Sequence, residues 1–114
     1  MSGTTFKRGD LALVPYPFSD LSATKRRPVL VLSDPDVYGD FLAMAVTSKS
    51  HHAQSVAIDQ SAIVKGHLPA ASWIRIDRIV TLNAALIVKV FGTVTDAFVL
   101  GAIRAMCYRV GYRP

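Results

Sequence analysis

The sequence predicts an α+β domain that is mainly β: a small, strongly bent antiparallel sheet or partly closed barrel with one C-terminal helix over its end. Three observations support this fold class. The 114 residues suffice for a single domain, 1–114. Short β-like runs alternate with proline and glycine along most of the chain. The one helical pattern follows the last of these runs, so it is placed to cover the sheet.

The first strand is expected over 10–14, because prolines at 15 and 17 cannot donate to a sheet ladder. A long polar loop, 15–27, follows; such loops often carry function. Pro28 holds the residue before it extended, and the apolar run 29–32 predicts a strand buried on both faces.

Further strands are expected over 41–47, 55–59, 72–77 and 86–91. The first is apolar throughout and predicts a central strand, whereas 55–59 alternates and predicts a half-buried one. The run 72–77 also alternates, and Gly92 is expected to close the last strand.

The helix is expected to begin at Thr95-Asp96, which are good N-cap residues and place a negative charge at the positive end of the helix dipole. It should end at Gly111. Apolar residues recur within it at three- and four-residue spacing, which predicts packing against the sheet: Val99, Ala102, Ile103, Met106 and Val110.

The charge balance favours a polyanionic partner, either nucleic acid or an acidic protein. The chain has thirteen Lys and Arg residues and eight acidic residues, all of them aspartates, and its isoelectric point is about 9.7. The alternative is a mildly basic surface with no specific partner. The 51% hydrophobic content indicates a real core.

No apolar run has the roughly 18 residues that a membrane span requires, and residues 1–6 lack the apolar stretch of a signal peptide. The single cysteine, Cys107, fits a reducing compartment. We therefore expect a cytoplasmic protein with no membrane association.

The sequence contains no nucleotide-cofactor, zinc-protease or C-x-x-C motif, so neither a cofactor nor a metal is expected. His51 and His52 are adjacent and would point to opposite faces of a strand, and with His67 they are interpreted as exposed loop residues.

Arginine, aspartate and hydroxyl groups remain, and these suit chemistry on a phosphodiester. Arg27 stands where the polar loop meets the buried strand, and its guanidinium can bind phosphate oxygens from there. The alternative is a solvated loop end. Thr47, Ser48 and Lys49 offer hydroxyls and a cation at the end of a central strand, although alone they are simply a polar loop.

Trp73, Arg75 and Asp77 share one face of the predicted strand 72–77, opposite its two isoleucines. Arg75 and Asp77 are close enough to reach one phosphate and its neighbouring hydroxyl, or else form an ordinary surface ion pair. Trp73 is interpreted as a surface on which an unpaired base stacks, or as a core or interface residue.

Together these residues resemble the MazF/PemK family of bacterial toxin endoribonucleases. The resemblance runs from Phe6 to about Gly111. It rests on the terminal helix and on the order and spacing of five segments: Lys7-Arg8-Gly9-Asp10-Leu11, Pro17-Phe18-Ser19-Asp20-Leu21, Arg27-Pro28-Val29-Leu30-Val31, Val46-Thr47-Ser48 and Ser72-Trp73-Ile74-Arg75-Ile76-Asp77. It implies an SH3-like barrel, a homodimer and metal-independent cleavage of single-stranded RNA. It also implies a cognate antitoxin with a flexible acidic segment.

By position, Arg27 and Thr47 resemble the family's phosphate-binding residues, and Arg75 and Asp77 resemble an Arg-x-Asp pair found in one branch. The implied mechanism is attack of the ribose 2′-hydroxyl on the adjacent phosphate, with Asp77 as base. The expected RNA contacts are Ser19, Lys25, Arg26, Ser48, Lys49 and Trp73. The first loop lacks the Gly-Glu-Gln stretch and the histidine of several members.

Two other functions remain open. CcdB toxins share the barrel and bind DNA gyrase without nuclease chemistry, since a fold does not determine a function. A catalytically silent barrel that binds RNA or protein is the second. Substitution of Arg27 separates the silent barrel from the nuclease, because a binding module has no cleavage to lose.

Overall fold

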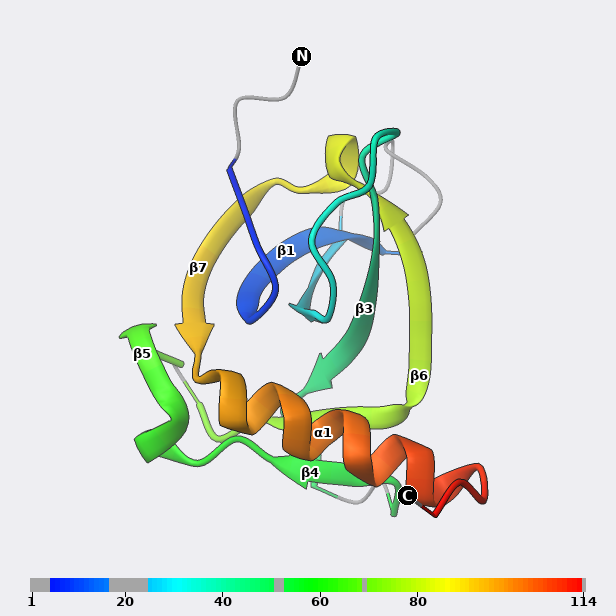
Figure 1. Cartoon of the computed structure of the whole chain (residues 1–114). Helices are drawn as coiled ribbons and strands as arrows, with labels where there is room; N and C mark the ends of the chain where they lie inside the picture. The colour runs from blue at the N-terminus through cyan, green and yellow to red at the C-terminus, as the bar shows by residue number, and fades with distance from the viewer. Residues whose placement is uncertain (1–4, 17–24, 51–52, 69, 114) are drawn as a thin grey trace.

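The computed structural model describes residues 5–16, 25–50, 53–68 and 70–113, and the strands described there form a single antiparallel sheet (Figure 1). Its strands are β1 (Asp10–Tyr16), β2 (Lys25–Val31), β3 (Asp40–Thr47), β4 (Ser55–Ala57), β5 (Ile63–Gly66), β6 (Trp73–Asn83) and β7 (Lys89–Val94). The helix α1 (Asp96–Arg109) follows, and short 3-10 turns occupy Gln60–Ala62 and Ala84–Leu86.

The sheet is curled into a partly closed barrel. Its strand order is β4-β6-β3-β2-β1-β7-β5, so β4 and β5 lie at opposite edges although only 58–62 connect them. In a flat sheet six strand spacings would separate these edges by about 29 Å. The six steps from Ala57 to Ile63 reach about 21 Å at most, so the sheet must bend back on itself. The predicted fold class is therefore confirmed.

The helix α1 lies across one end of the curled sheet, as predicted (Figure 1). The Thr95 hydroxyl caps it by accepting a hydrogen bond from the Phe98 amide at 3.1 Å. Val99 and Ala102 are buried beneath it in a cluster that we call the helix-side core, whose other buried members are Leu11, Leu30, Leu32, Met44, Val46, Ile74, Ile76 and Val94. The packing prediction is wrong for Val110, which is 71% exposed because α1 ends at Arg109.

A second buried cluster fills the other side of the central strands and contains Ala12, Val14, Val29, Val31, Phe41, Ala43, Leu82 and Ile87. Residues of β2 alternate between the two clusters, so the prediction of a strand buried on both faces is confirmed. The strand nevertheless begins at Lys25, before Pro28. Its pairing with β3 starts only at Val29, so Pro28 removes no donor from an established ladder on that side.

Other element boundaries differ from the prediction for local reasons. β4 ends at Ala57 because Asp59 caps the next turn, its carboxylate accepting from the Ser61 amide at 3.0 Å. β6 continues to Asn83, and β5 was not predicted. Gly92 lies inside β7, where a Cβ would come within 3.1 Å of the Lys65 carbonyl oxygen, so glycine here permits close strand approach.

Within the described part of the chain, α1 and the short turns fall short of the length and apolar content that a membrane-crossing helix needs.

Candidate active site

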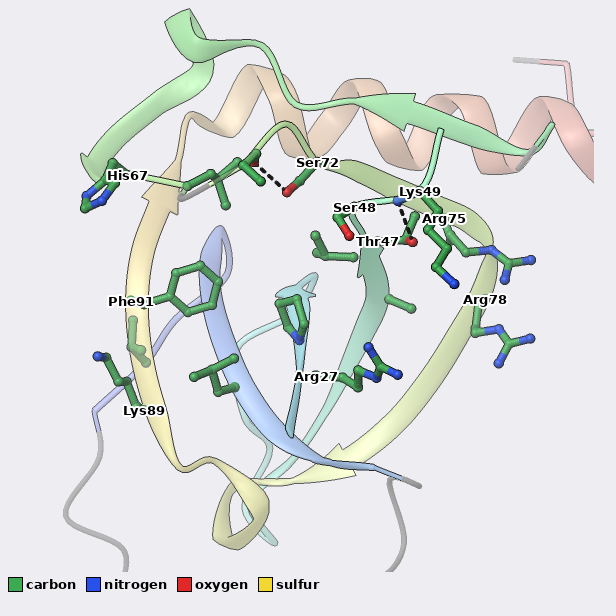
Figure 2. Close-up of a pocket in the computed structure, with 17 residues that line it drawn as sticks. Arg27, Thr47, Ser48, Lys49, His67, Ser72, Arg75, Arg78, Lys89 and Phe91 are labelled. Carbon is green, nitrogen blue, oxygen red and sulfur yellow. Dashed lines mark hydrogen bonds between the residues drawn. The ribbon is translucent and has the colours of Figure 1, made fainter. Parts of the chain in front are cut away.

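A cavity of about 1020 Å³ opens between β2, β3, β6, β7 and the segment that joins β5 to β6 (Figure 2). Its lining combines apolar and polar side chains. We call it the basic cavity, and its lining residues are Leu13, Arg27, Pro28, Ala45, Val46, Thr47, Ser48, Lys49, His67, Leu68, Ala70, Ser72, Arg75, Arg78, Lys89, Val90 and Phe91.

The charged residues that line the basic cavity are all positive. Five Lys and Arg side chains border it, and none of the described residues that line it is acidic. Clustered cations beside low-dielectric walls concentrate the field and attract anions. The cavity is therefore suited to a phosphate-bearing ligand.

Arg27 and Thr47 approach the cavity from neighbouring strands. Arg27 precedes the first β2–β3 pair, Val29 with Ala45, by two residues, Thr47 follows Ala45 by two, and both side chains line the cavity. The Thr47 hydroxyl accepts a hydrogen bond from the Lys49 amide at 3.1 Å, which fixes the oxygen and leaves its hydrogen available to donate (Figure 2). These two predicted residues are therefore brought together at one cavity.

A bend in β6 carries Arg75 and Arg78 to the edge of the basic cavity. β6 pairs with β3 at Met44–Ile79 and again at Val46–Ile74, so residues 75–78 lie opposite Ala45 alone. Such a bulge bends a strand and redirects its side chains. β6 turns a corner in Figure 1, and both arginines point away from the centre of the cavity in Figure 2.

Arg75 and Asp77 form a bidentate ion pair. Arg75 Nε donates to Asp77 Oδ1 at 3.2 Å, and Nη2 donates to Oδ2 at 2.8 Å. The two side chains are 19% and 31% exposed. The hydrogen bonds from Arg75 hold the pKa of Asp77 below its ordinary value of 3.8. Asp77 is thus ionised at neutral pH and borders the cavity only through its partner, because it is not among the lining residues.

The predicted RNA contacts divide into two groups. Ser48 and Lys49 line the basic cavity. Lys25 and Arg26 are exposed on β2, and Trp73 is half-buried on β6 opposite Thr47; these three are not among the lining residues. Ser19 lies outside the described residues.

Sequence reasoning missed the opposite wall of the cavity. His67, Leu68, Lys89 and Phe91 line it, and Arg78 extends the basic edge of β6. The alternation in Lys89-Val90-Phe91 did place Lys89 and Phe91 on one face of a strand. No local pattern indicated that this face would meet Arg27 across a cavity, because the meeting depends on the curl of the sheet.

Among the described residues, which omit His51 and His52, no three His, Cys, Asp or Glu side chains are grouped as metal ligands. Cys107 is a half-buried free thiol on α1. The expectation of a reaction without a metal remains a prediction.

Solved structures support the fold over nearly the whole chain. An endoribonuclease from mycobacterial species is 22% identical over 97% of this chain and 96% of its own, with a TM-score of 0.69. A MazE–MazF structure from Deinococcus radiodurans is 19% identical over 96% of this chain and 99% of its own, with a TM-score of 0.70. A mycobacterial endoribonuclease in complex with its cognate antitoxin is 22% identical over 96% of both chains, with a TM-score of 0.67.

No curated protein matches the chain. A family model described as PemK-like, MazF-like toxin of type II toxin-antitoxin system matches residues 7–106. That match contains all four residues predicted to be catalytic. The chain therefore belongs to the PemK-like, MazF-like family of toxins of type II toxin-antitoxin systems.

Proposed function

We propose that this toxin is an endoribonuclease that cuts single-stranded RNA without a metal ion. The observation that carries the proposal is the basic cavity, which joins Arg27, Thr47 and Arg75 at a site whose described lining holds no acid. Family membership supports it, as does the similarity in fold to proteins described as endoribonucleases. The phosphodiester of RNA is an anion that carries its own nucleophile, the adjacent 2′-hydroxyl.

Arg27 and Thr47 are proposed to hold the scissile phosphate. An arginine keeps its proton at any ordinary pH, so Arg27 acts as a fixed positive charge and a bidentate donor rather than as a proton carrier. The Thr47 hydroxyl donates to a second oxygen of the phosphate. Negative charge on these oxygens grows as the 2′-oxygen attacks, and donors aimed at it stabilise the transition state more than the bound substrate.

In the proposed step the bond between the 2′-oxygen and phosphorus forms, and the bond between phosphorus and the 5′-oxygen breaks. Asp77 accepts the proton of the 2′-hydroxyl, and water supplies a proton to the 5′-oxygen while Arg75 stabilises its charge. The products are a 2′,3′-cyclic phosphate and a 5′-hydroxyl end.

The ion pair gives Asp77 a second role that has its own support. A carboxylate with a lowered pKa is ionised and ready to accept a proton, but it is a weak base. The two hydrogen bonds to Arg75 also fix the guanidinium at the edge of the cavity. Asp77 can therefore act as the proton acceptor or as the residue that positions Arg75. These two roles predict different losses of activity when Arg75 and Asp77 are substituted.

The basic cavity and its surroundings also indicate the partners of the protein. Lys25, Arg26 and Trp73 are proposed to contact RNA outside the cavity, and Ser19 is also proposed as an RNA contact. A homodimer, a cytoplasmic location for this protein and a cognate antitoxin are also proposed. A flexible acidic segment of the antitoxin would neutralise the basic cavity and block RNA. Similar structures described as MazE–MazF and as an endoribonuclease with its cognate antitoxin support this arrangement.

The test is incubation of the purified protein with mixed-sequence single-stranded RNA and matched DNA in excess EDTA, followed by chemical mapping of new ends. We expect cleavage of RNA only, with cyclic-phosphate and 5′-hydroxyl ends. Arg27→Ala should abolish it, whereas Arg104→Ala, on the exposed part of α1, should leave it intact. Intact RNA with continued growth arrest would overturn the proposal and direct attention to DNA gyrase.

A further inference from the structure

The wall of the basic cavity formed by β7 and the segment after β5 has no part in the proposed reaction. Phe91 is half-buried there, and Leu68 and Val90 lie beside it along the lining. Part of the Phe91 side chain packs against the helix-side core. Figure 2 shows its ring directed into the cavity, whereas the Lys89 and His67 side chains on the same wall point away from the cavity centre.

The backbone around Phe91 is held by an unusually close approach of two strands. Gly66 of β5 pairs with Gly92 of β7 and has a φ of +75°. A Cβ at Gly66 would collide with the Phe91 carbonyl oxygen and lie 2.9 Å from the Gly92 Cα. His67 and Leu68 follow directly from this contact. This contact holds the Phe91 backbone against β5, and the ring itself is half-buried.

The cavity is larger than the scissile phosphate requires. Pockets that enclose a drug-sized molecule have volumes of about 300–1,000 Å³, and the basic cavity reaches about 1020 Å³. A phosphate held by Arg27 and Thr47 leaves space for an adjoining nucleoside. Aromatic rings with neighbouring cations are the features on which single-stranded nucleic acids stack their bases.

We propose that Phe91 forms a nucleobase subsite: an unpaired RNA base adjoining the scissile phosphate stacks on its ring, beside the positive charge of Lys89. This deepens the proposed function and rests on it for the identity of the scissile phosphate. A stacking face without a hydrogen-bonding edge accepts any base, so the subsite contributes affinity and positioning more than sequence choice.

The experiment measures binding and needs no cleavage. Fluorescence anisotropy with labelled 2′-fluoro RNA, which lacks the attacking hydroxyl, compares wild type with Phe91→Leu and Phe91→Tyr. Phe98→Leu is the matched control, because Phe98 packs against the same helix-side core and is not among the cavity lining. Leucine preserves apolar packing, and thermal melts confirm that each variant is folded.

We expect Phe91→Leu to raise the Kd about five- to a hundredfold, and Phe91→Tyr and Phe98→Leu to change it by less than about twofold. An abasic scan then locates the stacked nucleotide. At one position, removal of the base should weaken RNA binding by the wild type and eliminate the difference in Kd between wild type and Phe91→Leu.

Equal losses for Phe91→Leu and Phe98→Leu, or a Phe91→Leu loss that persists at every abasic position, would overturn the subsite. A Phe91→Leu variant that binds like wild type would also overturn it. The outcome is separate from the nuclease test: stacking without cleavage would preserve the subsite and refute the endoribonuclease, and cleavage without stacking would do the reverse.

Discussion

Arg75 and Asp77 meet through two hydrogen bonds, of 3.2 Å from Nε and 2.8 Å from Nη2, at the bulge where β6 turns away from β3. The pair is thus built into a corner of the barrel. Only one of its members, Arg75, borders the basic cavity. A carboxylate that accepts a hydrogen bond on each oxygen is well placed to fix the guanidinium of its partner. The activities of variants at Arg75 and Asp77 should reflect this arrangement.

Asp77→Asn should lower kcat about 10²- to 10⁴-fold if Asp77 accepts the 2′-hydroxyl proton, because the amide cannot do so. Arg75→Lys would retain more activity in that case, since the charge remains. If Asp77 only positions Arg75, the two single variants and the double variant should lose similar amounts of activity. Single-turnover rates on one RNA distinguish the results, and equal activity of wild type and Asp77→Asn would contradict both roles.

The ion pair should stabilise the fold in a pH-dependent way. Because the folded pKa of Asp77 is lowered, its contribution is present above the unfolded value of about 3.9 and is lost as the pH falls through the folded pKa. Thermal melts of wild type and Asp77→Asn should differ at pH 7 and converge toward pH 2. The difference should be small, because both side chains are partly exposed. Melting temperatures that diverge on acidification would contradict this sign.

Thr47→Val should reduce cleavage strongly, because valine matches the shape of threonine and removes the hydroxyl that donates to phosphate. We expect a loss of about 10²-fold in kcat, the size found when one transition-state donor is removed. Thr47→Ser keeps the hydroxyl and should stay within about tenfold of wild type on the same scale. Similar rates for the valine and serine variants would show that the hydroxyl takes no part.

Gly66→Ala should destabilise the protein by at least about 2 kcal/mol, because its positive φ strains any other residue and the Cβ has no space beside Phe91. Gly101→Ala is the matched control. Gly101 lies on the exposed side of α1, where an added Cβ would meet no atom within 4 Å, and alanine there should stabilise by about 0.5–1 kcal/mol. Urea unfolding measures the change in the free energy of unfolding for both variants. Equal changes would refute the close packing at Gly66.

Much of the fold was accessible from sequence because it depends on local patterns. The cap at Thr95, the doubly buried run around Leu30 and the alternation from Trp73 to Asp77 each predicted the observed element. The predicted ends of elements were wrong where tertiary contacts determine them. Gly92, for example, lies inside β7 because β5 packs closely against it.

Some residues of the candidate site were also predictable from sequence, and others were not. Arg27, Thr47 and Arg75 were predicted from residue type and strand position, with the family resemblance, and they do border one cavity. Phe91 and Lys89 were not predicted, because they border the cavity only when β7 is brought around by the curl of the sheet. The bulge at 75–78 was also beyond prediction, since it depends on the register with β3.

In the proposed reaction the 2′-hydroxyl of the RNA is the nucleophile. The most direct measurement uses an RNA oligonucleotide with one 2′-deoxy nucleotide placed 5′ to the mapped cleavage bond, with cleavage followed in EDTA beside the unmodified RNA. We expect the modified bond to stay intact while binding is nearly unchanged. Cleavage of the deoxy-substituted bond at the normal rate would contradict the claim, because the attacking oxygen would then come from another source.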